Sequence, residues 1–259
     1  MMDAQHPLAP AVVLEIVVDT AAGLRIAAEN GADRIELCGA LSVGGVTPST
    51  GLMKLAAEMS CPVRAMVRPR GGDFCYDGDE LAIMHDDIFA AARCGLEGVV
   101  IGANLADGSL DQTALAGLVA HARAHGLRVA IHRGFDLASD PRKALEACIA
   151  LKVDTILTSG GANTAAAGIS GLSTLVKSAA GRIEILAGGG VTADNAGAIL
   201  ASGVTSIHAS CGSAPKIGDD RAAALGYGNE KQTDARLVAA LRTTLSPSFL
   251  TQPLLEPRS

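Results

Sequence analysis

Short apolar runs alternate with stretches of helical periodicity along most of this chain, and the runs recur about every 20 to 35 residues. Between the runs, apolar residues share one helical face, as Leu115, Leu118, Val119 and Ala122 do. The predicted strands lie at residues 12–18, 34–37, 63–67, 98–101, 128–131, 155–157, 183–187 and 204–207. Eight strand–helix units in about 250 residues are typical of a single (β/α)8 TIM barrel of the α/β class.

A doubly wound open sheet is the alternative fold. It usually has about five to seven strands and a Gly-x-Gly-x-x-Gly motif after the first strand, and this sequence lacks that motif. No composition shift marks a second domain, so we expect a single barrel domain over residues 1–259. The barrel is expected at 11–245, a C-terminal tail at 246–259, and a lid or flexible loop at 214–233.

Helix boundaries are marked by capping residues and glycines. Thr47-Pro48 and Asp140-Pro141 each place a capping side chain before a proline at the first helical position. Thr192 is a third candidate cap. The glycines that we expect in a left-handed conformation just beyond helices are Gly31, Gly95, Gly126, Gly181 and Gly203.

The loop after the third predicted strand brings two arginines, two glycines and a carboxylate close together. The guanidinium groups of Arg68 and Arg70 are planar forks of donors that suit carboxylate or phosphate. Gly71 and Gly72 allow the backbone to turn sharply or to approach a ligand closely. The sequence therefore predicts an anion-binding loop, in which Asp73 holds an arginine, accepts a proton or binds a metal.

Ionisable residues in four predicted strands lie opposite the apolar face. Because side chains alternate along a strand, Glu15, Glu36, His132 and His208 are expected to point into the barrel, near the mouth. The residues that we predict to do acid–base chemistry are Glu15, Glu36, Asp73, His132 and Asp136. The alternative is a structural network in which the two glutamates neutralise arginines. The arginines available for it are Arg68, Arg128 and Arg133.

Three glycines follow the seventh predicted strand and precede a candidate helix cap. Exposed backbone N–H groups at such a position resemble the phosphate cradle of many barrels. A tight turn that needs glycine is the alternative. The predicted anion-binding residues at this rim and at the neighbouring strand ends are Arg68, Arg70, Arg133, Ser159, Gly188, Gly189, Gly190 and His208.

Charge and composition disfavour several classes of protein. A net charge of −6 and 2% aromatic residues disfavour nucleic acid as a partner. The N-terminus lacks the pattern of a signal peptide, and no apolar stretch is long enough to span a membrane. The six cysteines form no Cys-x-x-Cys pair, so we expect reduced thiols and a cytoplasmic location.

Seven motifs follow one another along the chain. They are Leu-Glu-Ile at 14–16, Asp-Arg-Ile-Glu-Leu-Cys at 33–38, Gly-Gly-Val-Thr-Pro-Ser at 44–49, Arg-Pro-Arg-Gly-Gly-Asp-Phe at 68–74, His-Arg-Gly-Phe-Asp at 132–136, Leu-Thr-Ser-Gly at 157–160 and Ala-Gly-Gly-Gly-Val at 187–191. Together they resemble the CutC family, described as cytoplasmic copper homeostasis proteins. The resemblance implies a (β/α)8 barrel, usually self-associated as a homo-oligomer, with a Cu(I) site that uses cysteines near the mouth.

The resemblance transfers unevenly to the cysteines. Cys38 matches the family's cysteine after the second strand, whereas the position expected for the other cysteine is Val17 here. Cys75 and Cys211 also follow predicted strands and are candidate replacement ligands. Cu(I) prefers soft thiolate or thioether ligands, so a site centred on Cys38 suits that ion.

Two functions are compatible with these patterns. The first is Cu(I) binding in copper homeostasis. The second is a TIM-barrel enzyme, an isomerase, lyase or hydrolase, that acts by acid–base chemistry on a small anionic, phosphorylated or sugar-like substrate. The expected partner is accordingly a copper ion or a small-molecule anion.

Overall fold

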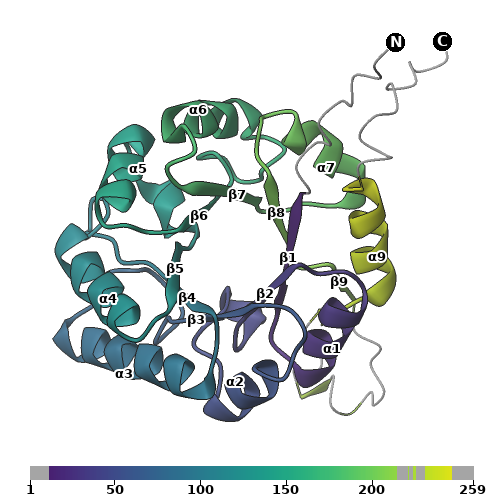
Figure 1. The fold of residues 1–259 in the computed structure, drawn as a ribbon, viewed down its shortest axis with the longest axis horizontal. Coiled ribbons are helices and arrows are strands. Elements are labelled where there is room, and N and C mark those ends of the chain that lie inside the picture. Colours follow the sequence, from purple (N-terminus) through teal and green to yellow (C-terminus); the bar gives the residue numbers. More distant parts are fainter. Residues whose placement is uncertain (1–11, 215–220, 222–223, 226–230, 247–259) are drawn as a thin grey trace, which may run out of the picture.

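Parallel strands close into a barrel, and helices surround it (Figure 1). The computed structural model describes residues 12–214, 221, 224–225 and 231–246. The barrel strands are β1 Val13–Val18, β2 Arg34–Leu37, β3 Val63–Met66, β4 Gly98–Ile101, β5 Arg128–Ile131, β6 Thr155–Thr158, β7 Glu184–Gly188 and β8 Ser206–Ala209. They pair in sequence order, and β1 closes the barrel by pairing with both β2 and β8. The predicted (β/α)8 barrel is confirmed.

The helices follow the strands and cover the outside of the barrel (Figure 1). They are α1 Ala21–Glu29, α2 Thr50–Ala56, α3 Gly78–Cys94, α4 Gln112–Ala124, α5 Pro141–Ala150, α6 Ile169–Ala179, α7 Ala193–Leu200 and α9 Ala235–Thr244. Two 3-10 helices, η1 Leu41–Val43 and η2 Arg133–Leu137, follow β2 and β5 at the ends where we expect the site.

One of the predicted helix starts is wrong. The cap at Asp140 is confirmed, but α2 begins at Thr50 with Ser49 as its cap instead of at Thr47-Pro48. The Thr47 hydroxyl accepts from the backbone N–H of Arg68 at 3.0 Å and donates to Asp87 at 2.7 Å, so tertiary hydrogen bonds occupy it. The five glycines predicted beyond helices all have positive φ, between 75° and 101°.

The alternation predicted for the strands is confirmed by two separate hydrophobic clusters. The larger joins strands to helices and holds the outward residues Leu14, Ile16, Ile35 and Leu37. The smaller lies inside the barrel and contains Val17, Cys38, Met66, Val100 and Ala130, with Leu41 against it. Residues of one strand therefore divide between the two clusters by their period of two.

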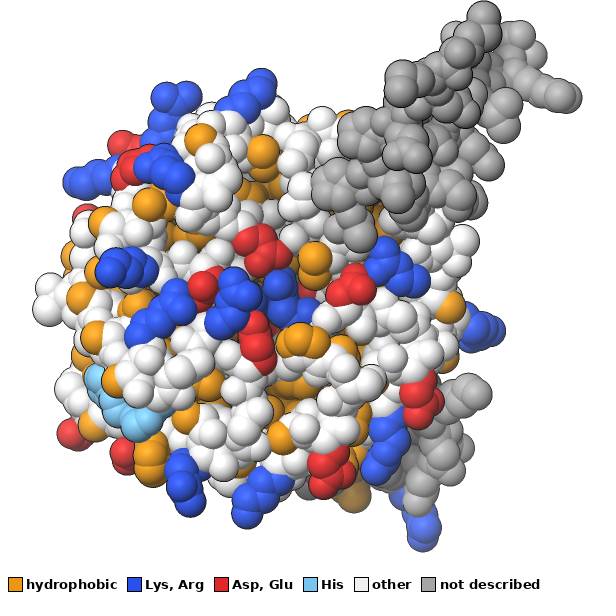
Figure 2. All heavy atoms as spheres, viewed as in Figure 1, with side chains coloured by type: hydrophobic (Ala, Val, Ile, Leu, Met, Phe, Trp, Pro, Cys, Tyr) orange, Lys and Arg blue, Asp and Glu red, His pale blue; other side chains and the backbone are white. Residues whose placement is uncertain are grey.

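The amino-terminal half of the barrel interior holds a network of buried ion pairs. Arg34 bonds to Glu15 and, through both terminal nitrogens, to Glu184 at 3.2 and 3.3 Å. Arg64, only 1% exposed, donates to Glu97 at 2.8 Å. On the face drawn in Figure 2, charged side chains of both signs gather over the centre of the barrel. The buried arginines of this half are thus paired with acids.

The segment predicted as a lid or loop is described only in part. Its described end contains β10 Gln232–Thr233, which pairs antiparallel with β9 Gly212–Ser213. Residues 215–220, 222–223 and 226–230, and the predicted tail from residue 247 onward, lie outside the described residues. In the part of the chain that the structure describes, no helix has the length and apolarity needed to cross a membrane.

Candidate functional site

A cavity of about 200 Å³ lies at the carboxyl-terminal ends of the strands, which is where TIM barrels place their active sites. Val17, Met66, Phe74 and Leu157 contribute apolar lining. The ionisable residues that line it are Glu36, Cys38, Arg68, His132, Arg133 and His208. All six are among the predicted site residues, so the fold brings together positions from four strand ends.

Glu15, His208 and Glu36 lie together inside the barrel, and the last two line this cavity. The Nδ1 atom of His208 lies 2.8 Å from a carboxylate oxygen of Glu15 and 3.4 Å from one of Glu36. Both glutamates are only 2% exposed, and β8 and β2 flank β1, which makes this meeting possible. Because carboxylates only accept, Nδ1 carries the hydrogen and His208 donates.

The pKa values of the two carboxyls in this cluster are shifted in opposite directions. Burial opposes ionisation of Glu15, but the hydrogen bond from His208 and the charge of Arg34 outweigh it and lower its pKa. Burial raises the pKa of Glu36, and the neighbouring Glu15 adds to that effect, while His208 opposes it. The pKa of His208 is raised because the carboxylates outweigh the cost of burying its charge. When the pKa values of two neighbouring carboxyls are shifted apart in this way, one group suits a fixed charge, here Glu15, and the other suits proton transfer, here Glu36.

The same three residues could in principle hold a cation, since one ligand atom from each lies within 4.8 Å of the others. Arg34 and the N–H group of His208 already pair with Glu15, so this carboxylate does not require a metal ion to balance its charge. Their oxygen ligands suit a hard ion and not Cu(I). The arginine partner of Glu15 is Arg34, and not one of the three arginines suggested by the sequence.

The three candidate cysteines do not converge. Cys38 is 1% exposed, lines the cavity, and its thiol lies 3.8 Å from a Glu36 oxygen. Burial and the charge of Glu36 raise its pKa well above the usual range. Cys75 is exposed, and Cys211 packs against the outer cluster, so neither lines the cavity with Cys38.

Arg68 is buried at the cavity with its terminal nitrogens committed to the backbone. Nη1 donates to the carbonyls of Val43 and Gly45 at 3.1 and 2.8 Å, and Nη2 donates to that of Gly72 at 2.7 Å. Its buried Nε makes no hydrogen bond of ordinary geometry with the described residues, although the Tyr76 hydroxyl lies close to this guanidinium. The predicted fork is therefore not free for a bidentate anion, and one N–H remains.

The imidazole ring of His132 packs against Gly102, the residue that follows β4. Its Nδ1 accepts from the backbone N–H of Gly134 at 2.9 Å, which leaves the hydrogen on Nε2. That Nε2 is buried and has no partner among the described residues. A Cβ atom at Gly102 would lie 2.2 Å from the imidazole Cε1, so only glycine leaves room for this ring. The Phe74 ring centroid is 4.4 Å from that of His132.

Arg70 and Asp73 pair with each other outside the cavity. Nη1 of Arg70 lies 3.0 Å from Asp73, and its Nε bonds to Glu80 in α3. Asp73 is 68% exposed in its side chain. The arginine thus holds the loop onto the capping box of α3, which Asp77 and Glu80 form.

Arg133, Asp136 and Ser159 form a second polar group at the rim. Arg133 donates from Nε to Asp136 at 2.9 Å and from Nη2 to Ser159 at 2.8 Å. Asp136 also accepts from the Ser159 backbone N–H at 3.0 Å. A Cβ at Gly189 would lie 3.0 Å from Arg133 Nη1, so the guanidinium covers the glycine turn. Gly189 and Gly190 have positive φ, and Gly188 ends β7.

The comparisons with known proteins agree with this architecture. A sequence profile of the CutC family matches residues 12–213. The chain belongs to the CutC family. A family protein CutC of Agrobacterium fabrum is 49% identical over 238 residues, 90% of this chain and 94% of its own. The corresponding protein of Rhizobium meliloti is 46% identical over 235 residues, 90% and 95% of the two chains.

A solved structure of the CutC family has the same fold. It is described as the putative copper homeostasis protein CutC from Streptococcus agalactiae, and it is 34% identical with a TM-score of 0.73. The match covers 77% of this chain and 98% of that one.

Three residues of the site escaped sequence prediction in this CutC family member. Phe74 lies against His132. The centroid of its ring is also 4.9 Å from the Cζ atom of Arg68. Met66 lines the cavity, which the strand face that it shares with Arg64 in β3 could have indicated. Gly102 packs against the His132 ring. Its position directly after β4 was the sequence signal that could have indicated a place in the site.

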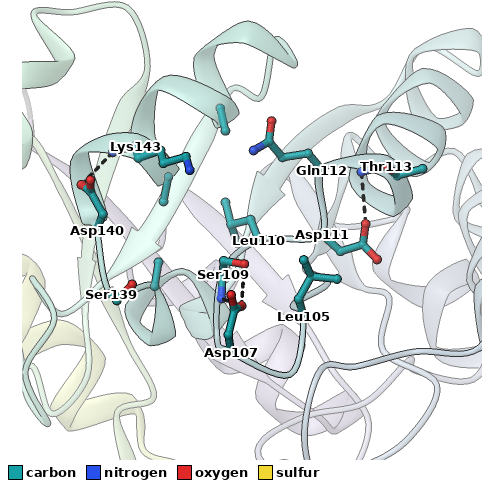
Figure 3. Close-up of a pocket in the computed structure, with 13 residues that line it drawn as sticks. Leu105, Asp107, Ser109, Leu110, Asp111, Gln112, Thr113, Ser139, Asp140 and Lys143 are labelled. Atoms are coloured by element: carbon teal, nitrogen blue, oxygen red, sulfur yellow. Dashed lines mark hydrogen bonds between the residues drawn. The ribbon is translucent and has the colours of Figure 1, made fainter.

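A larger hollow of about 600 Å³ lies between the loop after β4 and helices α4 and α5 (Figure 3). Its carboxylates are already engaged: Asp111 caps α4, Asp140 caps α5, and Asp107 accepts from Ser109. Figure 3 shows these bonds as dashed lines. None of the site residues predicted for this CutC chain lies in it, so the smaller cavity is the better candidate site.

The buried imidazole of His132 gives the protein a specific pH dependence. Burial and the charge of Arg68 lower its pKa from 6.5 to about 4, so between these values the unfolded chain binds a proton that the folded chain does not. The free energy of unfolding therefore falls as pH drops through this window, by up to about 1.4 kcal/mol per unit. Above pH 6.5 the group contributes nothing to the slope.

Urea unfolding of the wild type and of His132→Gln at pH values from about 7.5 to about 4.5 checks this expectation. The difference in unfolding free energy between the two proteins should change by about 3 kcal/mol across the window, because all other groups cancel. Parallel curves would contradict a neutral, buried His132.

Proposed function

We propose that this CutC family member is an acid–base enzyme whose active site is the cavity at the barrel mouth. Glu36 carries the proposal: it is a buried carboxyl with a raised pKa, it lines the cavity, and His208 links it to the ionised Glu15. A carboxyl tuned in this way can take and return a proton near neutral pH. His208 lies 3.4 Å from it and also contacts Glu15, which Arg34 pairs with in turn.

The substrate class is a small anionic or sugar-like compound. Four donor-bearing side chains, those of Arg68, Arg133, His132 and His208, line the cavity against one acid, Glu36. Most of their N–H groups are engaged, but the buried Arg68 Nε and His132 Nε2 have no partner among the described residues. This excess of donors favours a ligand rich in acceptor oxygens. A cavity of about 200 Å³ is smaller than the roughly 300–1,000 Å³ of sites for drug-sized ligands. A compound of a few carbon atoms is therefore the expected ligand.

A thermal-shift screen with small sugars, sugar phosphates and hydroxy acids tests whether this cavity binds such a ligand. A true ligand raises the melting temperature in proportion to the logarithm of its concentration above its Kd. Leu41→Trp plugs the cavity and should abolish the shift, since Leu41 lines it. Leu105→Trp, in the hollow of Figure 3, should leave the shift unchanged. The opposite result for the two variants would place the ligand in that hollow.

Cu(I) binding is a second candidate function, favoured by one observation. The Cys38 thiol and the Met66 thioether lie in the same interior cluster and line the same cavity. These are the soft ligand types that Cu(I) prefers. Cys38 must lose its proton to bind, and Glu36 lies beside it to accept that proton. The name of the Streptococcus agalactiae relative agrees with this candidate.

A titration of Cu(I) against a chromophoric competitor, under reducing conditions, measures the contribution of Cys38. Cys38→Ser should weaken the affinity by about tenfold or more, and Val17→Cys should strengthen it, because Val17 shares the interior cluster with Cys38. Cys75→Ser is the matched control, since that thiol is exposed and outside the cavity. Equal affinity in all four proteins would exclude copper from this site.

The cytoplasmic location and the self-association expected from the family belong to the same proposal. All six cysteines are free, which supports a reducing compartment.

A further inference from the structure

Two buried N–H donors of the cavity have no acceptor among the described residues. They are Nε of Arg68 and Nε2 of His132. The two residues are only 5% and 4% exposed. Leaving such a donor without a partner is costly, because its bonds to water are lost and not replaced. Buried polar groups of folded proteins nearly always have a partner, so an unpaired donor beside a cavity is one that a bound molecule can complete.

Both donors are held in position before any ligand arrives. Three backbone carbonyls fix the outer nitrogens of Arg68, and the Gly134 N–H fixes Nδ1 of His132. Phe74 lies beside both, with its ring 4.9 Å from Arg68 Cζ and 4.4 Å from the imidazole. Donors that need no rearrangement are what stabilises an oxyanion in a transition state.

The imidazole is neutral at neutral pH. Burial and the charge of Arg68 disfavour its protonated form and lower its pKa to about 4. A neutral imidazole can donate one hydrogen bond from Nε2 without giving up its proton to the ligand. This arrangement suits an oxygen that gains charge during a reaction more than an oxygen that is fully charged beforehand.

We infer that Arg68 Nε–H and His132 Nε2–H form an oxyanion hole for the carbonyl oxygen of a small hydroxyaldehyde or hydroxyketone. The reaction is then proton transfer at the carbon next to that carbonyl, with Glu36, which lines the same cavity, as the base. The role of Glu36 rests on the proposed function. The hole itself rests on the two unpaired donors.

The chemical step balances without any further reagent. The Glu36 carboxylate removes the proton from the carbon next to the carbonyl, and the C–H electron pair forms a carbon–carbon double bond. The carbonyl π pair moves to oxygen, and the hole binds the resulting enediolate. The neighbouring hydroxyl proton then passes to that oxygen, and Glu36 returns its proton to the former carbonyl carbon. The product is an isomer of the substrate.

Glycolohydroxamate, which mimics an enediolate, tests the hole by binding alone. Calorimetry should show binding to the wild type and a loss of about tenfold or more in His132→Leu. His132→Gln should retain most of the affinity, because its amide also donates. His125→Leu is the matched control, since that histidine is exposed at the C-terminal cap of α4 and does not line the cavity.

Gly102→Ala provides a second variant that leaves the imidazole chemically intact. Its added methyl group would lie 2.2 Å from Cε1, so the ring must leave its position and affinity should fall as in His132→Leu. Circular dichroism and melting temperature establish that each variant is folded. No binding to the wild type, or equal binding to His132→Leu and the wild type, would overturn the inference.

Deuterium incorporation separates the inference from the proposed function. Hydroxyacetone, glyceraldehyde and pentose phosphates are incubated in D2O and followed by NMR at the carbon next to the carbonyl. We expect exchange by the wild type and about 10²–10³-fold slower exchange in His132→Leu. Exchange that needs Glu36 but not His132 would overturn the hole and leave the proposed enzyme. Hydroxamate binding that needs His132, with exchange indifferent to Glu36→Gln, would leave the hole and remove the base.

Discussion

Replacing Arg34 by methionine is expected to destabilise the folded protein by about 3–5 kcal/mol, the largest stability effect that we predict for one substitution in the barrel. Arg34 is 8% exposed and bonds to Glu15 and to both oxygens of Glu184. Without it the buried carboxylate of Glu15 and the partly exposed carboxylate of Glu184 lose their arginine, and His208 alone remains for Glu15. A buried charge left unpaired is far costlier than the pair itself is stabilising.

Urea unfolding at neutral pH measures this effect. Arg182→Met is the matched control, because Arg182 and Glu146 form a pair on the surface, and it should barely move the unfolding midpoint. The double variant Arg34→Met/Glu15→Gln should recover part of the loss, since one unpaired charge is then removed. If Arg34→Met were as stable as Arg182→Met, the buried network would not be what fixes Glu15.

The sequence indicated the direction of side chains better than their partners. Period-two alternation was sufficient to place Glu15, Glu36, His132 and His208 inside the barrel, because a buried strand leaves two faces only. The order of strands in a barrel then brings β8, β1 and β2 together. The cluster of Glu15, His208 and Glu36 follows from those two rules.

The partners of the arginines depend on loops that come from distant parts of the chain. Arg68 is held by carbonyls at Val43 and Gly45, whose conformation no local pattern specifies. Arg70 turns outward, where it pairs with Asp73 and with Glu80 of the α3 capping box. Two arginines that both follow β3 therefore have different surroundings, which their positions in the sequence do not indicate.

Cysteine positions show the same limit. Cys38, Cys75 and Cys211 all follow strands, yet only Cys38 points into the cavity. Cys75 lies several residues beyond β3, and Cys211 has a left-handed φ of 44° that places it outside the strand alternation. Beyond the last residue of a strand the regular alternation of side chains stops, so the position of a cysteine after a strand does not predict where its side chain points.

Glu36→Gln is expected to lower turnover by about 10²–10⁴-fold while substrate binding stays within a few-fold of the wild type. Glutamine has the shape of the carboxyl and can still bond to Cys38 and His208, but it cannot accept a proton. Because burial already disfavours the charge of Glu36, the neutral amide should cost little stability or even add to it. Turnover and stability should therefore separate in this variant.

The most direct measurement of the proposed acid–base function is substrate turnover by NMR, with the wild type and Glu36→Gln compared on the ligands found by the thermal-shift screen. Glu146→Gln is the control, because that carboxyl pairs with Arg182 on the surface. We predict conversion by the wild type and by Glu146→Gln, with conversion lost in Glu36→Gln although the ligand still binds. Equal conversion by Glu36→Gln and the wild type would contradict the assignment of Glu36 as the proton carrier.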